Sequence, residues 1–173
     1  MSSNNEQKMM VSVQTENHSP SSWRSRVPIT LLATAGLLIA SYLAAYQLGL
    51  VREVWEPFFG RGSERVLHSF MSRILPLPDA ALGAIGYAFE VMASLIGGAN
   101  RYRARTRVVL FYGLVVAALA ITAIALTAIQ FFVVQAACTL CLTSAAISLV
   151  VAFLARAEVF AAVHLLYAKR KTK

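Results

Sequence analysis

Four long apolar runs alternate with polar segments along this chain. The runs extend from Ile29 to Leu50, from Ala80 to about Ala99, from Val108 to about Ile129, and from Phe131 to Ala155. About 20 consecutive apolar residues are enough for an α-helix to cross the ~30 Å hydrocarbon core of a bilayer. The pattern therefore predicts an all-α integral membrane protein whose four transmembrane helices form a bundle with antiparallel neighbours.

The first apolar run has an alternative interpretation as a secretory signal peptide. Its roughly 22 residues exceed the 7–15 residues of a signal-peptide apolar region, so we expect an uncleaved transmembrane helix. Residues 1–26 are polar and show no periodicity, which is typical of a disordered tail. The chain then divides into a disordered cytoplasmic tail (1–26), a four-helix membrane domain (27–155) and a basic cytoplasmic tail or surface helix (156–173).

The segment between the first two runs differs from the others because it mixes charged and aromatic residues. Val51 to Pro78 is longer than the roughly 12–15 residues beyond which a loop is usually functional or disordered. Its apolar positions from Val66 to Leu75 predict a short amphipathic helix that lies on the bilayer surface. We expect this long extracytoplasmic loop to act as a lid, and Asp79 to cap the N-terminus of the next helix.

Composition supports the membrane class. Hydrophobic residues make up 58% of the chain and charged residues 14%, against about 25% charged residues in soluble domains. A net charge of +8 can indicate a nucleic-acid partner. Here the basic residues flank the apolar runs, so we interpret them as determinants of topology and expect no nucleic-acid binding.

The distribution of basic residues also predicts the orientation in the membrane. Arg24, Arg26, the arginine-rich segment 101–107 and the basic C-terminus fall on one side of a four-helix topology. The positive-inside rule places that side, and with it both termini, in the cytoplasm. The long loop and the start of the last run then lie on the extracytoplasmic side. We expect the bacterial inner membrane, whose periplasmic face is oxidising.

The chain has only two cysteines, Cys138 and Cys141, and both lie near the expected start of the last helix. Residues three apart share a helical face at about 5–6 Å, within reach of a disulfide, and a helix N-terminus favours a thiolate. We interpret the pair as a redox-active dithiol at the membrane surface, for which a quinone dissolved in the lipid is a suitable electron partner.

Two other interpretations of the cysteines remain open. They can be incidental small hydrophobic residues of the helix. They can also belong to a zinc site, but zinc takes about four ligands, and only His68, Glu64 or Asp79 is suited to complete the set. The zinc interpretation is the weaker of the two, so we expect no metal.

Glu90 lies about eleven residues into the second run, hence roughly 16 Å deep at 1.5 Å per residue. An ionised carboxylate in hydrocarbon is costly, so we expect this carboxyl group to be protonated and to face the interior of the bundle. It can hydrogen-bond another helix, line a cavity or form part of a proton route.

Three features together resemble the vitamin K epoxide reductase family. They are a long loop after the first of four helices, a Pro-x-x-x-x-Gly-x-x-x-Tyr segment from Pro78 to Tyr87, and the sequence Cys138-Thr139-Leu140-Cys141 that opens the fourth helix. The resemblance covers roughly Ile29 to Leu154, and the combination is more specific than any one feature.

The resemblance implies roles for individual residues. Asp79, Gly83 and Tyr87 would bind the quinone, and the family commonly has at the position of Asp79 an asparagine that hydrogen-bonds the ring. Cys141 would face the quinone and pass electrons to it, and Cys138 would exchange with an incoming thiol. The loop from Val51 to Leu77 would cap the quinone pocket.

Two positions depart from the family pattern. The long loop lacks the pair of shuttle cysteines that the family usually has, and Ala145 stands where animal members have a tyrosine. We therefore expect a membrane thiol–quinone oxidoreductase that receives electrons directly from a thioredoxin-like protein or a small thiol and reduces ubiquinone or menaquinone. The alternatives are a catalytically silent membrane scaffold and a small transporter that uses Glu90.

Overall fold

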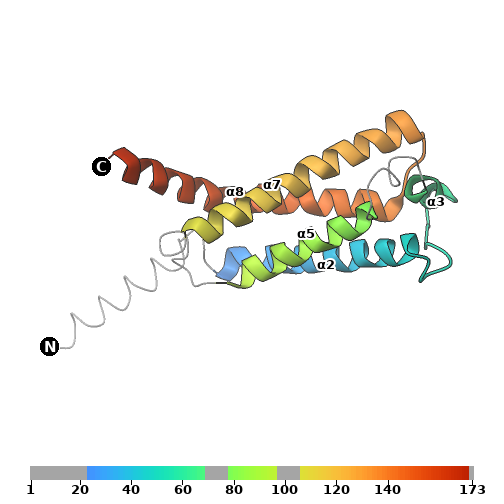
Figure 1. The fold of residues 1–173 in the computed structure, drawn as a ribbon, viewed down its shortest axis with the longest axis horizontal. Helices are drawn as coiled ribbons and strands as arrows, with labels where there is room; N and C mark the ends of the chain where they lie inside the picture. Colours follow the sequence, from blue (N-terminus) through green and yellow to red (C-terminus); the bar gives the residue numbers. More distant parts are fainter. Residues whose placement is uncertain (1–22, 69–77, 97–105, 172–173) are drawn as a thin grey trace.

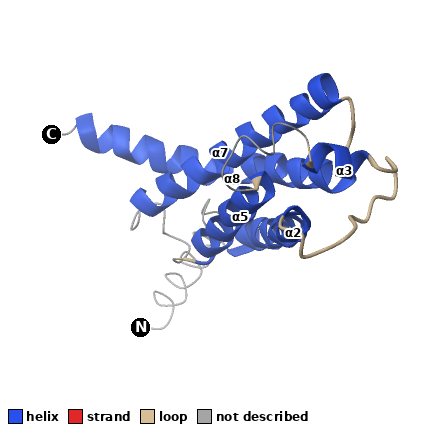
Figure 2. Cartoon of the chain, turned by 45° about the vertical axis from the view of Figure 1, so that its right-hand side comes forward, coloured by secondary structure: helices blue, strands red, loops and turns tan. Residues whose placement is uncertain are grey.

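The computed structural model describes residues 23–68, 78–96 and 106–171. These residues form helices and connecting segments, with no strand in the described ranges (Figure 2). The elements in chain order are α2 (Trp23–Gln47), α3 (Gly62–Leu67), α5 (Asp79–Leu95), α7 (Thr106–Ile129), a π-helical turn η1 (Gln130–Val134) and α8 (Thr139–Lys171). The prediction of an all-helical chain is confirmed for this part of the protein.

The four long helices lie side by side in two layers (Figure 1). The most extensive contacts join α2 to α5 and α7 to α8, and further contacts join α2 to α8 and α5 to α7. Short α3 lies across one end of the bundle, where it touches α8 and η1. The first residue of α2 and the C-terminal part of α8 lie at the opposite end (Figure 1).

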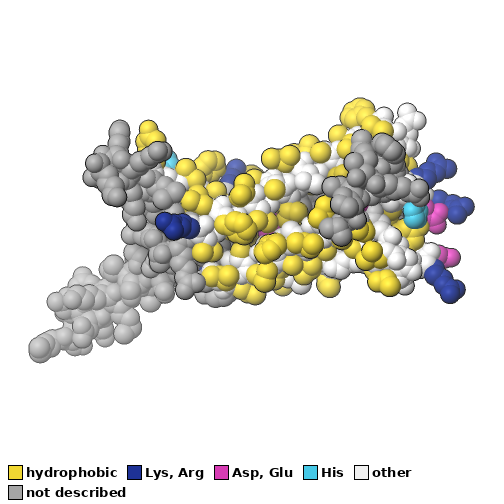
Figure 3. Space-filling model, in the orientation of Figure 1, with side chains coloured by type: hydrophobic (Ala, Val, Ile, Leu, Met, Phe, Trp, Pro, Cys, Tyr) yellow, Lys and Arg dark blue, Asp and Glu magenta, His cyan; other side chains and the backbone are white. Residues whose placement is uncertain are grey.

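Three of the helices are long and apolar enough to cross a membrane, namely 26–47, 107–134 and 139–164. Helix α5 has 17 residues, about 26 Å at 1.5 Å per residue, which is near the lower limit for a transmembrane helix. Figure 3 shows hydrophobic side chains covering the long helices, and charged side chains gathered at the end that carries α3. The surface is that of an integral membrane protein.

Several boundaries differ from the sequence-based prediction. The first helix begins at Trp23 and ends at Gln47, before Gly49, whose φ of 75° is left-handed. The four-helix topology expects an uncharged turn around residues 130–135, between the third and fourth helices. Instead η1 prolongs α7 to Val134, and Gln135, with φ 51°, ends the helix. The last helix begins at Thr139 and runs unbroken to Lys171.

The lid also differs in detail. Its helix α3 begins earlier than the predicted Val66–Leu75 segment, which lies largely outside the described residues. Asp79 was predicted as the N-cap of the second long helix, but Pro78 occupies the cap position and Asp79 is the first helical residue. The predicted tail lies outside the described residues up to residue 22.

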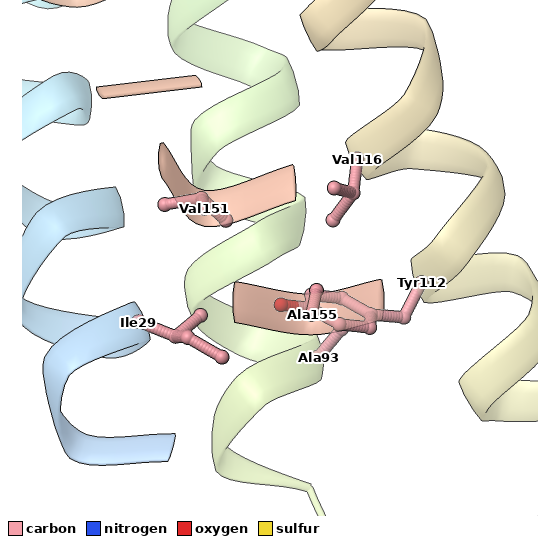
Figure 4. Close-up of a cluster of buried hydrophobic side chains, with 6 residues drawn as sticks. All are labelled: Ile29, Ala93, Tyr112, Val116, Val151 and Ala155. Carbon is pink, nitrogen blue, oxygen red and sulfur yellow. The ribbon is translucent and has the colours of Figure 1, made fainter. Parts of the chain in front are cut away.

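The long helices meet in a buried cluster (Figure 4). Its members come from α2, α5, α7 and α8, and they are Ile29, Ala93, Tyr112, Val116, Val151 and Ala155. The two alanines let the backbones approach closely, as small residues do between membrane helices.

Arg26 ties the beginning of α2 to the end of α5. Its side chain is buried, and its Nε and Nη2 atoms donate to the Ser94 carbonyl at 3.1 and 2.6 Å. Nη2 also donates to the Ile96 carbonyl at 3.0 Å. The last carbonyl groups of a helix lack partners within it and carry partial negative charge, so a guanidinium is a favourable cap. Besides its predicted influence on topology, Arg26 therefore fixes two helices to each other.

Candidate active site

The two cysteines lie at the N-terminus of α8. Cys138 is the residue before the helix, and its Sγ accepts a hydrogen bond from the backbone N–H of Cys141 at 3.2 Å. It thus caps the first turn as a serine or aspartate commonly does. The pKa of the Cys138 thiol is lowered, first by the hydrogen bond from the Cys141 side chain and further by Ser63, against the opposing effect of burial. Both cysteines are free thiols here.

The two thiols face different surroundings. Cys138 is completely buried, with 0% of its surface exposed, whereas Cys141 is partly exposed and lines a cavity inside the bundle. The two thiols are therefore neighbours in one helical turn, but only Cys141 borders the cavity.

The cavity measures about 110 Å³ and lies near the lid end of the bundle. This volume is smaller than the ~300–1,000 Å³ of pockets that enclose whole drug-sized ligands, so it suits a ring or head group. Its walls are mainly apolar. Polar groups project from several elements, and they are Asp79, Tyr87, Thr122, Thr127, Gln130, Ser144 and Ser148.

The predicted quinone-binding residues lie together on α5. Asp79, Gly83 and Tyr87 are spaced by four residues, so they share one face of the helix, and all three line the cavity. Tyr87 extends across the bundle because Gly36 leaves room for its ring; a Cβ atom at Gly36 would clash with that ring. The sequence motif therefore describes one wall of the cavity.

Asp79 is held at the end of α5 by Gln47 of α2. The Gln47 Nε2 donates to Asp79 Oδ1 and also reaches the Leu67 carbonyl of α3 at 3.4 Å. The backbone N–H of Ala80 lies 3.2 Å from Gln47 Oε1 and 2.9 Å from Asp79 Oδ1. One amide thus joins three helices beside the cavity.

Tyr87 connects α5 to α8. Its hydroxyl lies 2.7 Å from the Ser144 carbonyl, 3.1 Å from Ser144 Oγ and 2.6 Å from Ser148 Oγ. Neither serine was singled out from the sequence. Ser144 is three residues after Cys141 and Ser148 is four residues after Ser144, so all three lie on one helical face. This periodicity was the available signal.

Replacing Tyr87 by phenylalanine should lower the free energy of unfolding by about 1–3 kcal/mol, because the buried Ser148 hydroxyl loses its partner. Thermal unfolding in detergent micelles measures the change. Tyr167→Phe is the matched control, since the Tyr167 side chain is 69% exposed. Equal stability of the two variants would contradict the importance of this cross-helix contact.

Glu90 is buried with 0% exposure, as expected for a residue that faces the bundle interior. Neither carboxyl oxygen has a hydrogen-bond partner among the residues that the structure describes. Glu90 is also not among the residues that line the cavity. In the same ranges no group of three or more His, Cys, Asp and Glu side chains could hold a metal ion.

The lid supplies residues that sequence reasoning missed. Glu56 Oε2 accepts from the Thr139 backbone N–H at 3.0 Å, and its two oxygens also accept from the hydroxyls of Thr139 and Ser63. Partial burial alone would raise the pKa of Glu56, but the hydrogen bonds from Ser63 and Thr139 outweigh burial and lower the pKa. Nothing in the sequence distinguishes Glu56 from Glu53 or Glu64, so no signal was available.

Two comparisons with known proteins bear on this site. A family model described as "Vitamin K epoxide reductase family" matches residues 27–156, which include both cysteines, the lid and the cavity-lining residues. No curated protein sequence matches the chain.

Proposed function

Because this chain belongs to the vitamin K epoxide reductase family, whose members are generally oxidoreductases that use quinone, we propose that it oxidises thiols and reduces a quinone within the bilayer. The observation that carries the proposal is the position of Cys141. It places a thiol on the wall of a ring-sized cavity, in a residue whose backbone N–H donates to the Sγ of Cys138 at 3.2 Å.

The reaction balances as two successive two-electron steps. A donor thiolate attacks Cys138 in the Cys138–Cys141 disulfide, and Cys141 leaves as a thiolate. A second donor thiol resolves the mixed disulfide, so the donor is oxidised and both cysteines are reduced. The dithiol then gives two electrons and two protons to the quinone, which becomes a quinol while the Cys138–Cys141 disulfide re-forms.

The residues of the α5 wall would position the ring. Asp79, Gly83 and Tyr87 line the cavity. Asp79 would present its carboxyl group to a ring oxygen, and Gly83 and Tyr87 would border the ring. Such preorganised polar groups stabilise charge that develops on oxygen during reduction. Glu90 lies one helical turn beyond Tyr87 and is the nearest candidate on α5 for storing a proton inside the bundle.

The chain would belong to a branch of the family without loop cysteines, so a thioredoxin-like protein or a small thiol would act on Cys138 directly. We propose that α5 is a fourth transmembrane helix, with both termini cytoplasmic and the lid extracytoplasmic, in a bacterial inner membrane. This orientation is supported by the positive-inside pattern and by the location of α3 at the end of the bundle opposite to the start of α2 and the C-terminal part of α8.

The redox state of the two cysteines in native membranes tests the proposal. Alkylation followed by mass measurement should find the disulfide when ubiquinone or menaquinone is supplied, and the dithiol when quinone is withheld. The double variant Cys138→Ser/Cys141→Ser gives the background. If the pair stays in one state whatever the quinone supply, the protein is a scaffold without redox activity.

A further inference from the structure

We infer that Glu56 is a positioning residue that holds the lid closed over Cys138, so that an incoming thiol reaches Cys138 only after Glu56 has left the start of α8. The incoming thiol belongs to the proposed function, on which this inference rests. The closed lid itself is visible in the contacts of Glu56, Gly62 and Ser63.

Cys138 is inaccessible in the closed arrangement. Its exposure is 0%, and the lid residues Gly62 and Ser63 are buried with it. Ser63 also lies close enough to the Cys138 thiol to lower its pKa. From the other side, Gln130 Oε1 accepts from the Cys138 backbone N–H at 3.4 Å. Thiol exchange requires access to the sulfur under attack, so the lid has to move.

Glu56 provides the polar link between the lid and α8. Its carboxylate accepts from the backbone and the hydroxyl of Thr139 in the first turn of α8, and from Ser63 in α3. The N–H groups of Phe58 and Phe59 approach Oε1 at 3.5 and 3.4 Å, which folds the loop around the carboxylate. A negative charge is favourable at the N-terminus of a helix, and α8 has 33 residues.

Apolar packing contributes little to holding this part of the lid. Trp55, Phe58 and Phe59 are 66%, 78% and 48% exposed. The described part of the lid is anchored on either side of this segment instead. Leu67 is buried against Leu43 and Tyr46, with Val51 and Val54 packed on the same cluster, and the Tyr42 hydroxyl bonds the backbone of residues 53 and 55. Between these anchors Glu56 is the main polar contact of the described lid residues with α8. The sequence of the lid contains no cysteine, so no disulfide from the lid can hold it on α8.

The lid rests directly on the backbone that precedes Cys138. A Cβ atom at Gly62 would clash with the carbonyl oxygen of Ala137. Beside this contact lies an open notch lined by Phe59, Arg61, Gly62 and Arg65 of the lid and by residues 135–137. Movement of the lid at this edge would widen the notch and expose Cys138 to a thiol from the aqueous side.

Alkylation of Cys138 in the full-length protein tests the inference without any quinone. All variants carry Cys141→Ser, so that Cys138 is the only thiol, and they are studied in native membranes. Glu56→Ala should increase the rate of modification by a bulky maleimide-polyethylene glycol at least about tenfold, since hydrogen bonds to a charged group are lost. Glu53→Ala is the matched control, because Glu53 is an exposed lid residue whose hydrogen bond to the described part of the chain is made by its backbone carbonyl.

Two further measurements separate access from thiol acidity. The pKa of Cys138 is lowered overall, but the negative charge of Glu56 opposes this effect. Removing the Glu56 carboxylate therefore increases the thiolate fraction of Cys138. That effect moves the midpoint of the rate-against-pH profile, whereas an open lid raises the plateau at high pH. An open lid also favours the bulky reagent over small iodoacetamide, whereas altered acidity accelerates both equally.

The outcomes are distinct. A plateau rate that rises for Glu56→Ala but not for Glu53→Ala supports the inference, and equal plateau rates overturn it. If Glu56→Ala fails to accumulate in membranes, Thr139→Val removes a single donor to Glu56 and should give a smaller rise; no rise there also overturns the inference. Because the assay needs no redox turnover, lid opening without quinone-linked oxidation would disprove only the proposed function.

Discussion

Replacing Cys141 by serine is expected to abolish quinone reduction, with kcat/KM falling by at least about 10³-fold, as when an enzyme loses its nucleophile. Cys141 is the only cysteine on the cavity wall, and a serine hydroxyl cannot give up two electrons. Without Cys141, Cys138 remains a single thiol and cannot form the internal disulfide that a donor thiolate attacks. Quinol formation in membranes supplied with a dithiol reductant measures the loss.

The Cys141→Ser variant should also trap the oxidised form of the physiological donor. The Cys138 thiolate attacks the donor disulfide, one donor cysteine leaves as a thiolate, and a reductant releases the mixed disulfide that forms. Cys138→Ser is the informative control, because it should lose turnover equally but accumulate no complex with the donor. Retention of full quinone-linked thiol oxidation by Cys141→Ser would contradict the mechanism. A trapped complex in the Cys138→Ser variant would reverse the roles of the two cysteines.

Replacing Ala145 by phenylalanine should fill much of the cavity and lower quinone reduction at least about 10²-fold, since small misplacements of a substrate have effects of that size. Ala145 lines the cavity of about 110 Å³ one turn beyond Cys141. The thiol chemistry at Cys138 should persist, because that residue lies outside the cavity. Quinol formation and Cys138 alkylation, measured on the same membranes, separate the two effects.

Ala146→Phe is the matched control for this experiment. Ala146 is the next residue on α8, but its side chain is exposed rather than on the cavity wall. It should therefore retain quinone reduction. If Ala145→Phe also retained it, the cavity between the helices would not be the quinone site, and another route from Cys141 to the lipid would be needed.

Much of the helical framework was predictable because a transmembrane helix is a local property of the chain. The first, third and last apolar runs form helices long enough to cross a bilayer, and the second run forms the shorter helix α5. The boundaries were less predictable. A turn was expected to begin at Gln130, but the helix continues to Val134. The Gln130 amide is buried and bonds the backbone of Cys138, so tertiary contacts compensate for its polarity.

The grouping of Asp79, Gly83 and Tyr87 on one wall was also predictable, because a four-residue spacing places side chains on one face of a helix. Their partners were not. Gln47 lies 32 positions before Asp79, and Ser148 lies 61 positions after Tyr87. Such pairs depend on how the helices are rotated against one another, and a helix such as α7, which is apolar all round, gives no indication of its inward face.

By itself, the sequence determined that this protein is a helical membrane protein with a CxxC pair at the start of its last apolar run. Those features follow from hydrophobicity and spacing over fewer than about 25 residues. Only the tertiary structure decided that Cys141 borders the cavity while Cys138 is buried beneath the lid. It also decided that Glu56 bonds Thr139, which lies 83 positions away in the sequence. The position of a loop over a helix depends on the packing of the whole bundle.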